Sequence, residues 1–225
     1  MILHIESSTK TCSVCVSHNG SVSAIRESHD EHYSHAEKLA VYIEEVTNEI
    51  GGPDKLTAVC VSSGPGSYTG LRIGVSAAKG LCFGLGIPLL SVDSLQSIAM
   101  LARTSNKVNT DDVLMPMIDA RRMEVYTAMF DHSGSATSEI TATVIDENTR
   151  FNHTHNLFFF GDGAAKCKGV IELENVIHLS EIQASSKGMI QLAETKLANN
   201  EVEDLAYFEP FYLKEFVAGK PKKIF

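Results

Sequence analysis

The histidines are the first side chains that could do chemistry, because a metal can be held by two imidazole rings on one face of a helix. Such a pair stands four residues apart, and none of the nine histidines has a partner at that distance: they lie at positions 4, 18, 29, 32, 35, 132, 153, 155 and 178. His29, His32 and His35 follow at intervals of three, but they cross the predicted start of a helix, so their rings need not converge. The spacing favours a solvated polar connection, and we expect no metal site.

The cysteines offer a second possible metal or redox site. Cys12 and Cys15 form a C-x-x-C pattern, but on a strand this spacing sends the two side chains to opposite faces. There are five cysteines, and no second C-x-x-C completes a zinc site. Strand packing is therefore the favoured interpretation. The odd count without framework spacing also predicts reduced thiols and a cytoplasmic protein.

The glycine-rich segment 63–74, SGPGSYTGLRIG, joins a predicted buried strand to a predicted helix. The first N–H groups of a helix are unpaired, so this junction could bind an anion. It lacks the Gly-Lys-Ser/Thr ending of a P-loop, and its glycine spacing differs from the dinucleotide fingerprint.

Small residues on the helix after this junction favour packing over anion binding. Gly70, Gly74 and Ala78 lie four apart and Ala77 lies beside them, which lets another helix approach closely. Apolar positions surround this seam at Leu71, Val75 and Leu81. We therefore expect arginine at Gly74 or Ala78 to abolish pairing with a partner while leaving the fold intact.

A hydroxyl-rich turn follows the first predicted strand and includes Glu6, Ser7 and Ser8. A nucleotide could sit there between two lobes, but the turn has no glycine to let backbone N–H groups surround a phosphate. We expect a degenerate nucleotide cleft instead. Asp119 and Arg121 could line this cleft or form an ion pair that holds the lobes together, and the second interpretation is favoured.

The first part of the chain reads as βββαβαβα. An Asn-Gly pair at 19–20 predicts a hairpin, and apolar residues at helical spacing predict a helix over 34–50. The predicted strands lie near 2–6, 11–17, 22–27, 56–62 and 88–92, and the predicted helices cover 34–50, 69–85 and 93–104. We expect this first lobe to span residues 1–104.

The second half repeats that plan. Strand-like runs lie at 113–118, 124–130, 138–145, 156–160 and 176–179, and a helix is predicted over 186–198. The expected fold is α/β, with two similar lobes of mixed sheets and flanking helices. The second lobe would span 105–202, and the tail 203–225 is expected to pack back on the first lobe.

Composition limits the possible partners. The chain has 225 residues, of which 44% are hydrophobic and 21% charged, and its formal net charge is −9. No apolar run suggests a membrane span and no leader is apparent. A nucleic-acid-binding protein usually needs a basic surface, so direct RNA binding by the isolated chain is disfavoured. The tail carries the one basic cluster, which could touch RNA in an assembly or be a solvated terminus: Lys214, Lys220, Lys222 and Lys223.

Several separated segments resemble, in the same order, the motifs of the TsaB (YeaZ) family. The glycine-rich segment is the most specific of them. The others cover almost the whole chain: ILHIESSTKTCSV, SHAEKL, MIDARRMEVYTAMF, FFGDGA and YLKEFVAGK. Glu6 stands where this family usually has Asp, and Met123 where many members have Gly, which weakens the expectation of nucleotide binding.

The resemblance implies an actin/Hsp70-like (ASKHA) duplicated fold and a non-catalytic role. The family supports the transfer of threonylcarbamoyl to N6 of adenosine 37 in tRNAs that read ANN codons. It implies pairing with the catalytic paralogue TsaD, addition of the TsaE ATPase, a homodimer when alone, and tRNA contact only through the complex. No cofactor is expected, with ATP or ADP binding at most at the partner interface. The interface would fall on the helices 34–50 and 69–85, at Leu39, Ile43, Val46, Gly70, Leu71, Gly74, Val75, Ala77, Ala78 and Leu81.

Two alternatives stay open at this point. The hydroxyl-rich turn and the glycines allow a free-standing ATPase or small-molecule kinase of the same superfamily, which Mg-ATP titration would reveal. The older metallopeptidase label of these families is disfavoured because its ligands are missing, and a stoichiometric metal in the purified protein would revive it.

Overall fold

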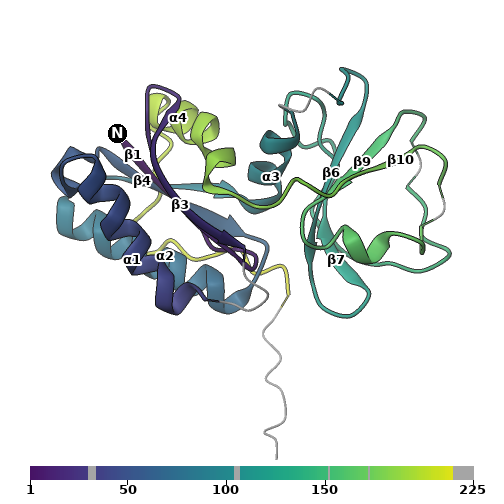
Figure 1. Cartoon of the computed structure of the whole chain (residues 1–225), viewed down its shortest axis with the longest axis horizontal. Coiled ribbons are helices and arrows are strands. Elements are labelled where there is room, and N and C mark those ends of the chain that lie inside the picture. The colour runs from purple at the N-terminus through teal and green to yellow at the C-terminus, as the bar shows by residue number, and fades with distance from the viewer. Residues whose placement is uncertain (30–33, 104–106, 152, 172, 215–225) are drawn as a thin grey trace, which may run out of the picture.

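A computed structural model describes residues 1–29, 34–103, 107–151, 153–171 and 173–214. Two lobes lie side by side, each built on a mixed five-stranded sheet (Figure 1). In the described residues, no helix combines the length and the apolar character needed to cross a membrane.

The first sheet has the order β3-β2-β1-β4-β5. β1 pairs antiparallel with β2 and parallel with β4. Asn19 and Gly20 adopt φ angles of 50° and 75°, which confirms the predicted hairpin between β2 and β3. The strands are β1 (Ile2–Glu6), β2 (Thr11–His18), β3 (Ser21–His29), β4 (Ala58–Gly64) and β5 (Leu89–Asp93).

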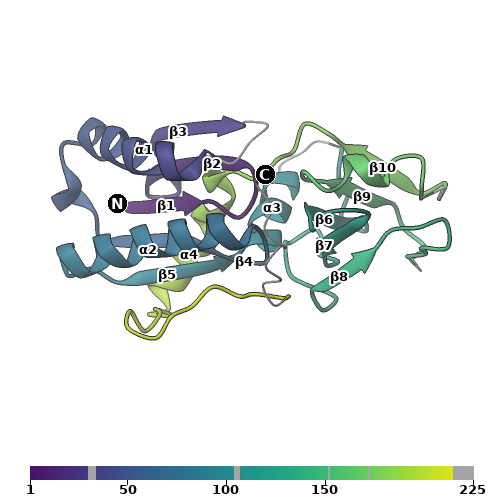
Figure 2. The ribbon, with the colours of Figure 1, turned by 90° about the horizontal axis from the view of Figure 1, so that it is seen from below.

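Two long helices, α1 (His35–Glu49) and α2 (Tyr68–Leu85), lie next to each other on one face of this sheet (Figure 2). Their apolar faces bury Leu39, Val46 and Val75 against strands β1, β2 and β4 in one core. Both helices match the lengths that the sequence predicts.

The second sheet repeats the order of the first, with β8-β7-β6-β9-β10 in place of β3-β2-β1-β4-β5. This repeated topology is the duplicated plan of the ASKHA fold. The strands are β6 (Val113–Asp119), β7 (Glu124–Thr127), β8 (Thr141–Val144), β9 (Leu157–Phe160) and β10 (Val176–Leu179). β7 and β8 are both shorter than predicted. Two connections of the second lobe, β8 to β9 and β9 to β10, correspond to those that contain α1 and α2 in the first lobe. In their described residues they contain one short 3-10 turn, Ala165–Cys167.

The two lobes exchange helices. α3 (Ser94–Arg103) follows the first sheet in the chain, yet Leu95 and Ile98 pack with β6 and β9 in the core of the second lobe. α4 (Ile190–Ala198) lies within the range assigned to the second lobe, yet Ala193 packs on the first sheet with Cys60 and Leu90. The lobe boundary predicted near residue 104 therefore divides the chain in sequence, but α3 and α4 each pack in the lobe on the other side of that boundary.

Residues 203–214 run back along the first lobe, and we refer to them as the strap. Glu203 N donates to Leu89 O at 2.8 Å and Phe211 N donates to Ser63 O at 2.7 Å. Lys79 Nζ on α2 donates to the carbonyl oxygens of Ala206 and Phe208, each at 3.1 Å. The strap thus covers the outer side of β5 and α2.

Candidate functional site

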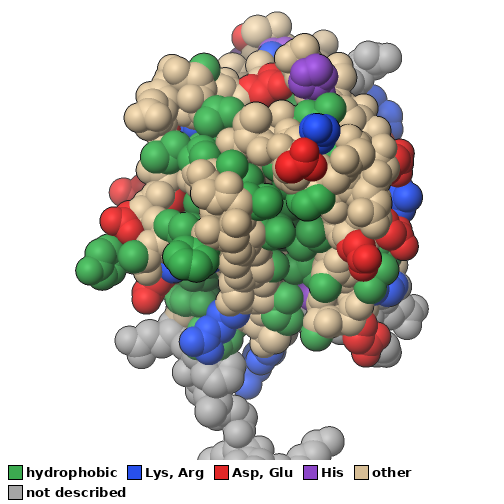
Figure 3. Space-filling model, turned by 90° about the vertical axis from the view of Figure 1, so that its left-hand side faces the viewer, with side chains coloured by type: hydrophobic (Ala, Val, Ile, Leu, Met, Phe, Trp, Pro, Cys, Tyr) green, Lys and Arg blue, Asp and Glu red, His purple; other side chains and the backbone are tan. Residues whose placement is uncertain are grey.

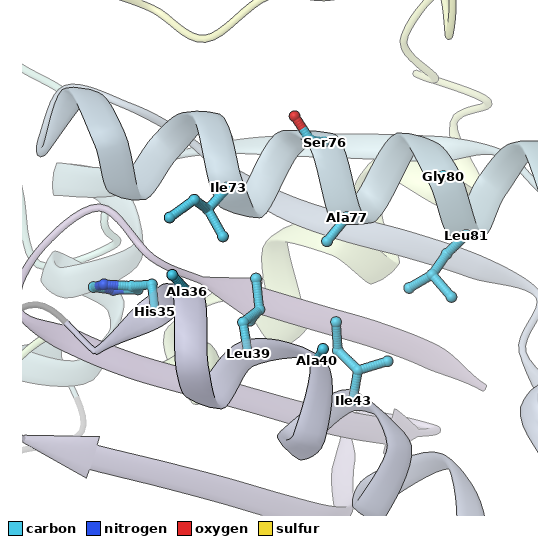
Figure 4. A pocket seen from close by; sticks show the side chains of 10 residues that line it. All are labelled: His35, Ala36, Leu39, Ala40, Ile43, Ile73, Ser76, Ala77, Gly80 and Leu81. Carbon is cyan, nitrogen blue, oxygen red and sulfur yellow. The ribbon is translucent and has the colours of Figure 1, made fainter.

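A groove runs between α1 and α2 on the outer surface of the first lobe (Figure 4). Its volume is about 400 Å³. α1 contributes His35, Ala36, Leu39, Ala40 and Ile43, and α2 contributes Ile73, Ser76, Ala77, Gly80 and Leu81. We call this feature the helix groove.

The helix groove exists because the facing positions of the two helices carry small side chains. Ala36 and Ala40 on α1 face Ala77 and Gly80 on α2, so the walls leave the space between the helix axes open. The buried side chains of Leu39 and Ile43 form part of its lining.

The lining is almost free of charge. His35 is its single titratable side chain; it is buried, and its Nε2 lies 3.0 Å from Thr11 O. Apolar side chains also stand exposed on the same two helices: Phe83 is 82% and Val41 47% accessible. Figure 3 shows apolar side chains gathered on one side of the molecule, with a hollow among them. A neutral apolar groove of this kind suits apolar side chains of another protein rather than a charged small molecule.

The predicted interface needs correction at six of its ten residues. Gly70, Gly74 and Ala78 face the sheet of their own lobe: a Cβ on Gly70 would overlap Ser7 O, and a Cβ on Gly74 would overlap Ser7 Oγ. The small-residue seam thus lets α2 approach the turn after β1, not a partner. The six predicted residues that do not line the helix groove are all buried: Val46, Gly70, Leu71, Gly74, Val75 and Ala78. The expectation that arginine at Gly74 or Ala78 would spare the fold is therefore wrong.

Four of the predicted residues do line the helix groove: Leu39, Ile43, Ala77 and Leu81. Sequence reasoning missed the other six: His35, Ala36, Ala40, Ile73, Ser76 and Gly80. α2 carries small residues on two faces, and periodicity alone does not say which face packs inward. Gly80 was the available signal for this face of α2. A glycine inside a helix weakens the helix, and the sequence pattern gives no packing reason for a glycine at this position.

The turn between β1 and β2 is closed by its own side chains. Glu6 is fully buried, and its Oε1 accepts hydrogen bonds from Ser8 N and Ser8 Oγ, each at 2.6 Å. Ser7 N donates to Ser62 Oγ at 3.3 Å, and Ser67 N donates to Ser8 O at 2.6 Å. Burial raises the pKa of Glu6, although the bonds from Ser8 oppose the shift. The amides of Ser7 and Ser8, which a phosphate would need, are thus already used.

The equivalent turn of the second lobe, between β6 and β7, is open. Asp119 forms an ion pair with Lys166, and both residues belong to the second lobe. This corrects the favoured interpretation of Asp119 as half of an ion pair between the lobes. Arg121 and Arg122 are exposed, and Arg121 N donates to Asp119 Oδ1 at 2.9 Å.

The histidine and cysteine candidates have structural partners. Among the described residues, no group of three or more His, Cys, Asp or Glu side chains could hold a metal ion. His29 Nδ1 lies 2.9 Å from Thr11 Oγ1, while His32 lies outside the described residues. Cys12 and Cys15 are both buried, and burial raises the pKa of Cys15 to about 12.

The chain is similar to known proteins both in sequence and in structure. The chain matches the family "TsaD: tRNA N6-adenosine threonylcarbamoyltransferase" over residues 29–219. It is 27% identical to the tRNA threonylcarbamoyladenosine biosynthesis protein TsaB of Escherichia coli, over 97% of this chain and 96% of that protein. The TsaB of Bacillus subtilis is 38% identical over 96 residues, which are 43% of this chain and 38% of that protein. The solved structure of YeaZ from Pseudomonas aeruginosa aligns with a TM-score of 0.80 at 23% identity, covering 94% of this chain and 99% of that chain.

Proposed function

The chain belongs to the TsaB (YeaZ) group of the TsaD family, and we propose that it is a non-catalytic subunit that binds and activates a TsaD-type paralogue. The complex would transfer threonylcarbamoyl to N6 of adenosine 37 in tRNAs that read ANN codons. In this proposal the TsaE ATPase joins the complex, and tRNA is contacted only within it.

The helix groove is the observation that carries the proposal. Its lining is apolar and its walls are small, so side chains projecting from another pair of helices can enter it. Exposed Phe83 and Val41 extend the apolar surface on either helix. Together they offer a binding surface without any chemistry of its own.

A paralogue is the occupant that sequence similarity favours. A tRNA N6-adenosine threonylcarbamoyltransferase of Cereibacter sphaeroides is 38% identical to this chain over 74 residues. A related chain can present a similar helix pair, and two such pairs can pack about a twofold or near-twofold axis. The same surface would join two copies of this chain when the paralogue is absent.

The absence of catalysis is part of the proposal and rests on the turn after β1. The amides of Ser7 and Ser8 already donate to Ser62 Oγ and Glu6 Oε1, which leaves little to bind a phosphate. No cofactor is proposed for the chain alone, and ATP or ADP would bind at most at the interface with the paralogue. Activity of the isolated chain in transferring threonylcarbamoyl to tRNA would contradict this assignment.

The test is co-elution with the TsaD paralogue from the same genome, using Gly80→Arg. A Cβ at Gly80 meets no atom within 4 Å, so arginine there spares the fold and fills the helix groove. Gly80→Arg should abolish the complex while keeping the helical circular dichroism signal.

Asn48→Arg is the matched control. It adds the same charge to an exposed position of α1 that does not line the helix groove, and it should leave complex formation intact. Unchanged pairing by Gly80→Arg would place the interface elsewhere, and separate elution of the two wild-type proteins would defeat the proposal.

A further inference from the structure

Two consecutive arginines at the turn between β6 and β7 adopt a backbone conformation that arginine disfavours. Arg121 and Arg122 have φ angles of 70° and 50°, in the left-handed region that glycine and asparagine accept more readily. Each such residue costs on the order of 1 kcal/mol. The hairpin therefore gains nothing in stability from arginine at either position, which points to a role for the side chains.

The backbone of this turn is held from within the second lobe. Lys166 pairs with Asp119 and donates to Arg122 O at 2.9 Å and Glu124 O at 2.6 Å. Asp119 also accepts from Arg121 N at 2.9 Å. The two guanidinium groups thus project from a fixed base.

Two carboxylates beside the turn are already engaged: Asp119 pairs with Lys166, and Glu124 pairs with Lys214 of the strap. Asp146 follows Ile145, whose N donates to Met123 O, and the Asp146 carboxylate accepts from Asn148 N and Thr149 Oγ1. Asp162 is half-buried, and its Oδ1 accepts from Asp119 N at 2.9 Å.

Three cations around the turn remain without an ion-pair partner among the described residues: Lys10, Arg121 and Arg122. Lys10 lies in the opposing turn after β1, and its charge acts on Asp162 across the gap between the lobes. Because Asp162 is hydrogen-bonded to the backbone of Asp119, Lys10 lies near the end of β6 from which the turn starts.

We propose that Arg121 and Arg122, with Lys10 beside them, bind phosphate groups of an RNA backbone when the chain is assembled with its paralogue. This inference rests on the proposed function and names the part of the chain that would touch tRNA. Guanidinium groups match phosphate oxygens with two parallel hydrogen bonds. The site is exposed, whereas a small nucleotide requires an enclosing pocket, so the phosphates of a polymer suit it better than free ATP.

The contact has a limited role, because two or three cations supply only part of the affinity for RNA. It positions the RNA on the assembly and does not read its sequence, since phosphate contacts carry no base information.

The test compares Arg121→Asn/Arg122→Asn with wild type in the complex. Binding of a fluorescent unmodified tRNA transcript is followed by anisotropy from 50 to 200 mM salt. The variant should bind about tenfold more weakly, with a salt slope smaller by roughly two. Its melting temperature should equal or exceed that of wild type, because asparagine accepts positive φ. Lower affinity together with undiminished stability separates a binding role from a structural one.

Lys55→Asn/Lys107→Asn is the matched control. It removes the same amount of positive charge, at two exposed lysines. These lysines lie before β4 and before β6, whereas the turn lies after the end of β6. It should bind RNA as wild type does. An equal loss in this control, or wild-type affinity and salt slope in the turn variant, would overturn the proposal.

Two further outcomes can be told apart from loss of RNA binding. Saturable binding of labelled ATP that the turn variant loses, with RNA binding unchanged, would assign the site to free nucleotide and overturn the RNA assignment. If the paralogue complex does not form, the proposed function fails on its own. The isolated chain is then titrated at 50 mM salt, where weaker RNA binding by the turn variant than by wild type supports the proposal and equal binding rejects it.

Discussion

The turn after β1 and the turn after β6 occupy the same position in two sheets of the same strand order, but they have opposite properties. The first is largely buried, has Lys10 as its exposed charged residue, and is closed by Glu6, Ser7 and Ser8. The second is exposed and basic, and it is braced by Lys166 from below. The difference follows from what covers each turn. α2 packs its glycine face on the first, while the matching connection of the second lobe has no long helix in its described residues. In a duplicated fold, one copy can thus become a structural junction while the other stays free for contacts.

The largest expected effect comes from placing a methyl group between α2 and the first turn. A Cβ on Gly70 would overlap the carbonyl oxygen of Ser7, which is backbone and cannot rotate away. Gly70→Ala should lower the free energy of unfolding by about 3 kcal/mol, measured by urea denaturation.

Gly163 follows β9 in the second lobe and lies against the end of β6. Its Cβ would lie 2.9 Å from Ile118 C and 3.0 Å from Asp119 N, a milder crowding. Gly163→Ala should cost about 1 kcal/mol. Equal losses in the two variants would mean that the two junctions are equally tight.

The brace of the second turn gives the next effect. Lys166→Met keeps the length of the side chain but removes the partner of Asp119 and the donor to two carbonyl oxygens. We expect a loss of about 2 kcal/mol and faster hydrogen exchange at the amides of Arg121 and Glu124. Lys168→Met, at an exposed site two residues away, should change neither quantity.

The buried carboxyl of the first turn should make stability depend on pH. Burial raises the pKa of Glu6 in the folded state, so the folded protein keeps a proton that the unfolded chain releases. Glu6 therefore lowers stability progressively as pH rises above 4.5. Glu6→Gln cannot ionise, so it should be more stable than wild type at pH 7.5, and its advantage should shrink toward pH 4.5.

This measurement must be made as a difference between variant and wild type. Burial lowers the pKa of His4 to about 3, so His4 removes stability as pH falls below 6.5, in the opposite direction. Both proteins share that contribution. An advantage of Glu6→Gln that does not vary with pH would show that Glu6 does not titrate in this range.

The smallest expected effects on stability come from two glycines that have open space where an alanine methyl group would lie. A Cβ at Gly80 or at Gly169 meets no atom within 4 Å, but only Gly169 has a positive φ, of 83°. Gly80→Ala should stabilise α2 by about 0.5–1 kcal/mol, whereas Gly169→Ala should destabilise the second lobe by about 1 kcal/mol. Thermal melts of both variants check the opposite signs.

Local patterns predicted most of the elements. The helical spacing of Leu39, Ile43 and Val46 placed α1, and the Asn-Gly pair placed the first hairpin. The order of elements along the first lobe, βββαβαβα, and the repeat of the three-strand arrangement also follow from pattern. The separated motifs were enough to identify the family.

Two features could not be predicted because they depend on long-range packing. The small residues of α2 lie on more than one face, and only the position of Ser7 shows that Gly70 and Gly74 face inward. The exchange of α3 and α4 between the lobes leaves no local signal, since each helix is amphipathic wherever it packs. The left-handed conformation of Arg121 and Arg122 was equally hidden, because nothing in their residue type favours it.

The exchange of α3 and α4 has a consequence for synthesis of the chain. The face of the first sheet that carries Ile2, Ala58 and Leu90 is covered by α4, which is synthesised after the strands of both sheets. Until then this apolar face has no cover, and a fragment ending after α3 would also expose the side of that helix meant for β6 and β9. We therefore expect the first lobe to complete its core only once α4 has been made, rather than to fold beforehand as an independent domain.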